Sequence, residues 1–436
     1  MLRMIIAVCL TIIATTARAE TDIRQVTSPG GINAWVVEEP SIPFVALELR
    51  FEGGASLDLP GKRGGTNLMS ALLEEGSGDM SAQEFQATLE DLAASLSFRA
   101  FDDSIAVSAR FLTENKEEVI ALLRQALLAP RFDQDALDRV RAQVLSGIAS
   151  DAKSPNAIAS SVFNAAAFGD HPYGSSIDGT IESVTVLTRQ DMIDAHRNAL
   201  VRDRLFVSVV GDTTAETVGA LLDDLLGDLP KEGPPLPEDV EPALDGGITV
   251  VDFDTPQSVA YFGHSGIERD DEDFFAAFII NHVLGGGGFS SRLMTEVREE
   301  RGLTYGIRSY LVPKSHAEMI LGTVASSNET IAEAIEVTRN EWARLAENGL
   351  TEEELTTAKT YLTGEYPLRF DGNAEIAKIM VGMQMIGLTP DYVVDRNDFV
   401  EAVTLDDVNR VAGELLRPED LHFVVVGKPV GLESTE

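Results

Sequence analysis

The chain has 436 residues, of which 71 are acidic and 34 are basic, so its formal net charge is −37. A chain of this length predicts two or three domains with full-sized cores, and a hydrophobic content of 44% is ordinary for a globular protein. The excess of negative charge argues against nucleic acid as a partner, because the phosphate backbone would be repelled. The acidic surplus fits a basic peptide or protein partner, a salty habitat, or simply a soluble surface.

Residues 1–19 have the pattern of a secretory signal. A positive start, an apolar run over residues 4–13 and a small-x-small site at residues 17–19 predict cleavage before Glu20. The apolar run is too short to span a bilayer, and no later segment is long enough. We therefore expect export across the inner membrane and a periplasmic location. The single cysteine, Cys9, leaves with the signal, so the mature chain is expected to have neither a disulfide nor a cysteine-ligated metal.

The predicted elements then repeat along the chain. Strand patterns, in which apolar and polar residues alternate or β-branched residues cluster, fall in two matching sets. The first set covers residues 32–38, 45–51, 105–111 and 205–210, and the second covers residues 248–253, 258–264, 317–324 and 421–426. Amphipathic helical patterns fill the segments between them. The proline-rich, acidic segment 230–244 separates the two sets and is typical of an exposed linker.

Two stretches of the second half align with stretches of the first without gaps. Residues 187–211 match residues 403–427 at an offset of 216, and in each the threonine at the second position is a predicted helix N-cap. Upstream, residues 132–145 match residues 350–362 at nearly the same offset, and each has an acidic first turn before an amphipathic helix. The chain is therefore predicted to contain one fold unit twice.

These patterns predict an α+β fold with two homologous repeats, each a mostly antiparallel sheet with helices packed on one face. The linker joins the repeats around a central cleft. The predicted limits are 1–19 for the signal, 20–229 for the first domain, 230–244 for the linker and 245–430 for the second domain. A cleft between two such halves suits an enzyme and a binding protein equally well.

Residues 285–305, GGGGFSSRLMTEVREERGLTY, hold the densest set of candidate site residues. A four-glycine loop is predicted to open a short charged helix, Gly302 to end it, and Tyr305 to begin a strand. This layout holds Arg298 and Tyr305 in fixed relation. A cation beside a phenol can grip a carbonyl or stabilise a developing oxyanion.

Other interpretations of the segment remain open. The helix could be a solvated face with local ion pairs, such as Arg292 with Glu296, and Tyr305 a half-buried strand aromatic. The glycines could hold an anion, but no Lys-Ser/Thr follows them, as a phosphate-binding loop requires. A backbone that comes close to a ligand, or a hinge between helices, fits them better. The four glycines are Gly285, Gly286, Gly287 and Gly288.

Residues 65–76, the motif His171-Pro-Tyr-Gly174 and the spacing of Arg298 and Tyr305 together resemble the insulinase/pitrilysin-type zinc peptidases, the inverzincins. The resemblance covers essentially the whole mature chain. In catalytic members, a helix at the position of residues 65–76 carries H-x-x-E-H, whose histidines bind zinc and whose glutamate activates water. A later glutamate completes the metal site. His171-Pro-Tyr-Gly174 itself is predicted to be a structural turn.

This chain departs from the family pattern at every metal-site position. Asn67 and Ala71 stand in place of the histidines, Ser70 in place of the glutamate, and Gly147 near the position of the later ligand. Zinc needs about three protein ligands, and the six histidines of the chain form no H-x₃-H pair. We therefore expect no metal and no cofactor in this chain.

The resemblance gives the segment 285–305 a role. In the family, the arginine and the tyrosine seven residues later bind the substrate main chain and help to stabilise the transition state at the zinc of another domain. This implies catalytic roles in trans for Arg298 and Tyr305, and substrate binding by the four glycines.

The resulting hypothesis is a zinc-free subunit of a heterodimeric periplasmic metallopeptidase, inactive on its own. Its partner would be a homologous subunit that bears H-x-x-E-H and carries the zinc. The substrate would be a peptide, and the acidic charge of the chain favours a basic one. The alternative is a non-enzymatic scaffold or peptide-binding protein of the same fold.

Overall fold

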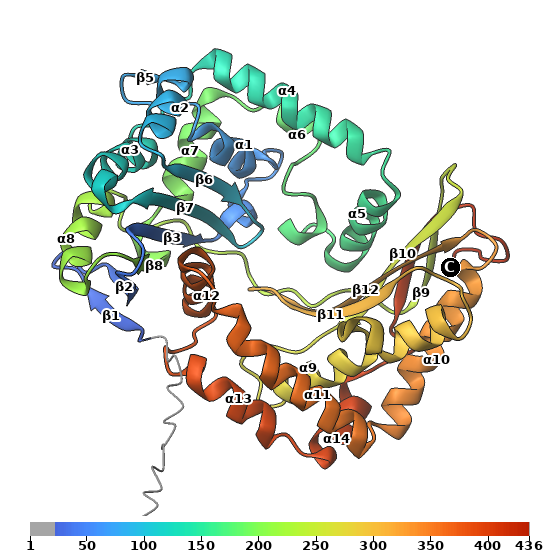
Figure 1. Ribbon diagram of the computed structural model, residues 1–436. Helices are drawn as coiled ribbons and strands as arrows, with labels where there is room; N and C mark the ends of the chain where they lie inside the picture. The colour runs from blue at the N-terminus through green and yellow to red at the C-terminus, as the bar shows by residue number, and fades with distance from the viewer. Residues whose placement is uncertain (1–21, 436) are drawn as a thin grey trace, which may run out of the picture.

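The computed structural model describes residues 22–435, and the predicted signal lies outside this range. Two sheets organise the chain: a six-stranded sheet in the order β1-β2-β8-β3-β7-β6 and a five-stranded sheet in the order β11-β12-β10-β13-β9 (Figure 1). All strand pairs in them are antiparallel except β2 with β8 and β9 with β13. The first sheet consists of β1 (Arg24–Thr27), β2 (Asn33–Glu38), β3 (Phe44–Glu52), β6 (Ser95–Ala100), β7 (Ser104–Leu112) and β8 (Leu205–Gly211). The second consists of β9 (Gly247–Asp252), β10 (Gln257–Ser265), β11 (Ile307–Pro313), β12 (Glu318–Ser327) and β13 (His422–Gly427), and β4 (Gly76–Ser77) and β5 (Met80–Ser81) form a separate small hairpin.

The helices of each half pack on the outer face of their own sheet, which confirms the predicted α+β repeats. Alternate strand residues such as Leu47 and Val107 face the helices in the first core, and Phe262 and Val324 do so in the second. The outer helices of the first half are α1 (Gly65–Leu72), α2 (Ala82–Asp91), α3 (Lys116–Leu128), α4 (Gln134–Asp151), α6 (Ile181–Thr185), α7 (Arg189–Ala199) and α8 (Ala215–Leu226). Those of the second half are α9 (Phe274–Asn281), α10 (Ile331–Asn348), α11 (Glu352–Glu365), α13 (Tyr392–Ala402) and α14 (Leu405–Leu415).

The aligned stretches fold into the same elements. Thr188 caps α7 and Thr404 caps α14, and in both caps the threonine and the aspartate three residues later form a reciprocal capping box. The strand that follows each helix ends in a glycine with positive φ, Gly211 at +136° and Gly427 at +156°. A Cβ at Gly211 would come within 2.1 Å of the Phe44 carbonyl oxygen, so a side chain cannot be accommodated there.

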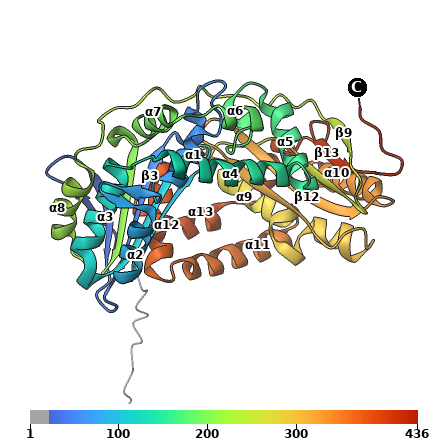
Figure 2. The same cartoon turned by 90° about the horizontal axis from the view of Figure 1, so that it is seen from above.

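The halves exchange one helix each, which the sequence did not predict. Helix α4 runs from the first sheet toward the second, and α5 (Pro155–Phe168) follows it onto the inner face of β10 and β13 (Figures 1 and 2). In return, α12 (Asn373–Met385) leaves the second half and packs on the inner face of β3 and β8. Phe163 of α5 and Met380 of α12 are fully buried in these contacts. Each fully buried side chain of this size contributes about 1.5–3 kcal/mol, so the exchange joins the halves firmly.

A polar junction adds to the contact between the halves. Tyr173 of the His171-Pro-Tyr-Gly174 turn donates a hydrogen bond of 2.5 Å to Asp103, in the turn between β6 and β7. From the second half, the Lys314 amine pairs with Asp102 at 2.7 Å and lies 4.0 Å from the centre of the Tyr173 ring. The motif at 171–174 therefore has a structural role, as the sequence indicated.

The linker 230–244 forms neither helix nor strand, although the backbone N–H of Val240 donates to the His316 carbonyl oxygen at 2.9 Å. The predicted domain limits stay a prediction. These limits divide the sequence into repeats. They do not divide the structure in the same way, because α5 and α12 each pack on the sheet of the other repeat. Within residues 22–435, no helix is long and apolar enough to cross a membrane.

The exchange predicts that the two halves unfold together. Met380 has no exposed surface and packs on the first sheet, so Met380→Ala should cost about 2–5 kcal/mol of unfolding free energy. Denaturant unfolding followed by circular dichroism should show one transition at a lower midpoint. The matched control is Ile386→Ala at the 46%-exposed position after α12, which should change stability little. A variant with one half melting at the wild-type midpoint would contradict the coupling.

Candidate functional site

The segment 285–305 is more helical than predicted. Helix α9 continues into a π-helical turn, His282–Gly286, so that Gly285 and Gly286 lie within helix. After a short 3₁₀ turn, a second helix ends in another π-helical stretch, Met294–Glu299. Two π-helical stretches so close together are uncommon, and such stretches are frequent at functional sites.

Gly302 ends the second helix as predicted. It has a φ of +63°, its N–H donates to the Arg298 carbonyl oxygen at 2.9 Å, and the Leu303 N–H donates to Val297 at 2.9 Å. These bonds close the last turn of the helix, and its left-handed position favours glycine. The chain then turns, and β11 begins at Ile307, so the expectation that Tyr305 begins a strand was wrong by two residues.

Tyr305 projects from this turn with 89% of its surface exposed. The turn itself is fixed, because the Thr304 hydroxyl donates to the Ala325 carbonyl oxygen of β12 at 2.6 Å. The alternative of a half-buried strand tyrosine is therefore wrong. Such an exposed phenol on an anchored turn is free to donate a hydrogen bond to a bound molecule.

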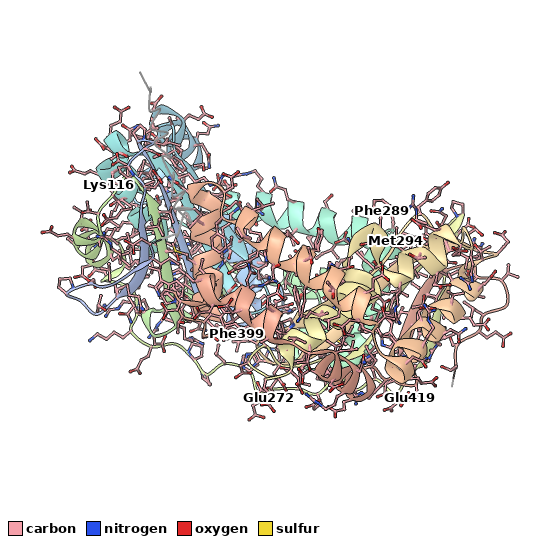
Figure 3. All side chains as sticks on the ribbon, turned by 60° about the horizontal axis from the view of Figure 1, so that its bottom comes forward. Lys116, Glu272, Phe289, Met294, Phe399 and Glu419 are labelled. Atoms are coloured by element: carbon pink, nitrogen blue, oxygen red, sulfur yellow. The ribbon has the colours of Figure 1, made fainter. Side chains whose placement is uncertain are left out.

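Arg298 forms no ion pair with any residue among 22–435. Its guanidinium carbon lies 4.8 Å from the centre of the Phe289 ring, a cation–π contact that steers the side chain without neutralising its charge. Phe289 is 68% exposed. The two exposed aromatic side chains, Phe289 and Tyr305, line an apolar cavity of about 440 Å³ together with Met294. Figure 3 labels Phe289 and Met294 close together on one side of the molecule.

The cavity draws on both halves of the chain. Asn156, at the start of the exchanged helix α5, lines it together with strand residues of the second sheet. Sequence patterns did not identify Phe289, Met294 or Asn156 as site residues. Phe289 could have been identified, because an aromatic residue directly follows four glycines. Asn156 could not, because it reaches the site only through the helix exchange.

The remaining charges of the segment hold the second helix in place. Arg292 makes a two-pronged ion pair with Glu354 of α11, at 2.7 and 2.8 Å, and does not pair with Glu296 as the alternative suggested. Glu296 pairs with Arg301 at 2.6 Å. Burial alone would raise the pKa of Glu354, but hydrogen bonds from Arg292 and from the Thr351 backbone outweigh it and lower the pKa to about 2. Of the arginines on this helix, Arg298 is thus the one left for a ligand.

Three of the four glycines serve packing within the chain. A Cβ at Gly285 would come within 2.5 Å of the Ser309 hydroxyl oxygen on β11, and one at Gly286 within 2.9 Å of the Asn281 amide. Gly287 is similarly close to His282. Gly288 has a φ of +62°, open space at its Cβ position and a place in the cavity wall. Substrate binding by the loop stays a prediction, and Gly288 is its best candidate.

The helix that carries H-x-x-E-H in catalytic relatives offers no comparable ligands here. The Asn67 amide donates to an Asp178 carboxylate oxygen at 2.7 Å, and Ser70 is 1% exposed with no partner for its hydroxyl among residues 22–435. Gly147 is exposed on α4, with nothing within 4 Å of its Cβ position. No group of three potential metal ligands occurs within the described residues. These positions do not fit a zinc ion, which needs about three ligands.

The fold and this site define a class: a two-repeat α+β chain of metallopeptidase architecture with an altered metal site. Residues 35–181 match the family described as Insulinase (Peptidase family M16), and residues 187–362 match the one described as Peptidase M16 inactive domain. The chain therefore belongs to peptidase family M16. The second match contains Arg298 and Tyr305.

Similar proteins span the whole length. The "Non-peptidase homolog YmxG" of Helicobacter pylori is 26% identical over 393 residues, which cover 89% of this chain and 90% of that protein. An uncharacterized zinc protease of Streptomyces coelicolor is 25% identical over 406 residues, covering 90% and 87%. A Pseudomonas fluorescens crystal structure titled as a peptidase M16 inactive domain aligns with a TM-score of 0.88 and 27% identity, over 95% of this chain and 100% of that one. These likenesses and the altered metal site support an inactive, non-peptidase homologue.

The Arg292–Glu354 pair predicts a pH-dependent stability. Because the folded pKa of Glu354 is depressed, its contribution is complete above pH ~4.5 and is lost as the pH falls toward about 2. Glu354→Gln should lower the unfolding free energy by about 1 kcal/mol at pH 7, a figure reduced for the partial exposure of the pair. The deficit should shrink in denaturant titrations between pH 5 and pH 3. The neighbouring Glu353→Gln is the control; if it matches Glu354→Gln at every pH, the pair has no special role.

The metal-site positions predict a recoverable zinc site. The wild-type chain should contain no stoichiometric zinc by elemental analysis. If only ligands were lost, the triple variant Asn67→His, Ala71→His and Gly147→Glu should bind about one zinc ion per chain, because Asn67 and Ala71 are one helical turn apart and Gly147 has room for a side chain. Tight zinc in the wild type, or none in a folded triple variant, would contradict this interpretation.

Proposed function

We propose that the chain is the zinc-free subunit of a periplasmic heterodimeric metallopeptidase, in which Arg298 and Tyr305 act on the substrate at a partner's zinc site. The partner would be a homologous subunit with an intact H-x-x-E-H motif. The observation that carries the proposal is a contrast within one chain. Arg298 and Tyr305 are presented for contact, while the positions of the metal site hold an amide, a buried hydroxyl and no carboxylate.

The two side chains suit the stabilisation of negative charge. A guanidinium can donate to a substrate carbonyl, and a phenol can donate to the oxyanion that forms when the carbonyl is attacked. Arg298 is uncompensated by any described carboxylate, so its charge is available. The contact with Phe289 and the hydrogen-bonded turn at Gly302 orient both groups in advance, which reduces the ordering cost of binding.

The way the halves are joined supports action in trans. The exchanged helices and the Asp102–Lys314 junction hold the first half against the second, and the described part of the first half offers no metal ligand group. Under this proposal, a site that uses both a metal and the arginine–tyrosine pair would include a second chain. The cavity beside Tyr305 gives a substrate side chain a place to bind at that interface.

A scaffold or peptide-binding protein without catalysis is the second candidate. The name of the Helicobacter pylori relative, a non-peptidase homologue, favours it. The two candidates differ in what they require of the phenol, because a scaffold does not need its hydrogen bond.

Cleavage assays with a partner separate the two candidates. Co-expression with a homologue that bears H-x-x-E-H should yield a complex that hydrolyses peptides. Arg298→Ala and Tyr305→Phe should each lower kcat/KM by about 10²-fold or more, as loss of an oxyanion donor does. Wild-type activity in both variants would sink the proposal.

Controls on the same surface sharpen this experiment. Arg301→Ala removes the neighbouring arginine, which pairs with Glu296, and Tyr361→Phe removes the hydroxyl of another exposed tyrosine. Both should keep near wild-type rates. Size-exclusion chromatography must show that every variant still assembles with the partner, so that lost activity reports on chemistry rather than on assembly.

A further inference from the structure

One strip of the first sheet has no helix on its inner face within the described residues. Helix α12 covers β3 and β8, and the outer helices cover the opposite face, but most of the inward residues of β6 and β7 remain at least partly exposed. Strand alternation places the inward side chains opposite the core residues Phe98 and Val107. The open strip consists of Ser95, Ser97 and Arg99 on β6 and of Ser108 and Arg110 on β7, whereas Ala106 between them is buried.

The open strip is cationic in a strongly anionic chain. Neither β6 nor β7 contains a carboxylate, although acidic residues outnumber basic ones by 71 to 34 overall. Arg99 is exposed and Arg110 is partly exposed, and neither forms an ion pair with a described residue. On the second sheet, the exposed Arg308 of edge strand β11 has the same character and lines the cavity beside Tyr305.

Acidic groups near the open strip are already engaged. Glu48 of β3 is 1% exposed, pairs with Arg50 at 3.2 Å and accepts a hydrogen bond from Ser108 at 2.7 Å. Glu375 of α12 pairs with Lys378 at 2.7 Å. Burial and neighbouring Glu75 raise the pKa of Glu74, and the charge of Arg99 acts in the opposite direction, but Glu74 and Arg99 form no ion pair. Arg99 and Arg110 thus lie within the field of nearby carboxylates, Glu74 and Glu375, but neither is held in an ion pair with a described residue, so both guanidinium groups can still pair with a ligand.

The spacing of the two arginines indicates the form of that ligand. Arg99 lies opposite Ala106, and Arg110 is four residues further along β7. At about 3.4 Å per residue and 4.8 Å per strand, the two positions are roughly 14 Å apart. An extended peptide repeats the same face every second residue, so residues four apart span the same distance.

We propose that the open strip binds an extended acidic peptide whose carboxylate side chains, four residues apart, pair with Arg99 and Arg110. The claim that this peptide is the substrate rests on the proposed function. The claim that the open strip binds such a peptide concerns the isolated chain alone. The net charge of the chain favours a basic peptide, but the local charge of the open strip favours an acidic one. Salt screens distant charges, so a bound peptide interacts mainly with the charged groups close to it.

Fluorescence anisotropy with the mature full-length chain tests the proposal. The probe, called here the spaced acidic peptide, is a labelled ten-residue peptide of Ser, Thr and Val with glutamate at its third and seventh positions. It should bind at least fivefold tighter than the same peptide with lysine at both positions, or with glutamate at the third and fourth positions, whose side chains fall on opposite faces. Raising the salt to about 0.15 M should weaken binding.

Variants assign the binding to the open strip. Arg99→Gln with Arg110→Gln should weaken binding of the spaced acidic peptide about tenfold, since each partly exposed pair contributes up to ~1 kcal/mol. Arg197→Gln is the control, because this exposed arginine of α7 also lacks an ion pair with a described residue but lies on the outer side of the sheet. Equal affinity for the spaced acidic peptide and its lysine counterpart, or an equal loss in Arg197→Gln, would overturn the proposal.

This experiment fails independently of the proposed function. It needs no partner and no cleavage, and it does not alter Arg298 or Tyr305. Loss of acidic-peptide binding with retained partner-dependent cleavage would remove the substrate class alone. If peptide binding is retained and Arg298→Ala leaves the cleavage rate unchanged, the proposed function is wrong, and the open strip remains a peptide-binding surface.

Discussion

The exchange of α5 and α12 is the constraint on which the rest of the structure depends. Each sheet needs a helix on part of its inner face, because Trp35 and Val210 on one sheet and Val424 on the other would be exposed without it. The helix comes from the other half in both cases. Neither half can then leave without exposing the apolar inner face of its partner, so the two repeats behave as one body.

This arrangement also decides where a site can form. The inner face of each sheet is only partly covered. On the first sheet the uncovered part lies toward edge strand β6, and on the second it lies where Arg308 of β11 and Thr323 of β12 line the cavity. On the second sheet the uncovered region continues into the cavity beside Tyr305, and on the first it carries Arg99 and Arg110. The helix exchange thus supplies rigidity and two open surfaces at once, which suits a chain that binds an extended partner.

Much of the fold could be predicted because the relevant signals are local. Capping residues and amphipathic patterns depend on residues within one or two helical turns. In a duplicated sequence each such signal occurs in both repeats, as at Thr188 and Thr404. The helix exchange could not be predicted, because the apolar face of α5 fits either sheet equally well in composition. The open side of the site was missed for the same reason: Asn156 reaches the cavity through long-range packing. The π-helical stretches were missed because they follow from close contacts such as Gly285 with Ser309.

The net charge of the whole chain does not predict the charge of its inner surfaces. The net charge is a sum over the surface, and salt screens it within about 8 Å under physiological conditions. Arg298, Arg99, Arg110 and Arg308 each lack an ion-pair partner among the described residues, although carboxylates are twice as abundant as basic groups. The proposed function and the proposed peptide site would give these arginines anionic partners: a substrate carbonyl that acquires charge for Arg298, and carboxylate side chains for Arg99 and Arg110.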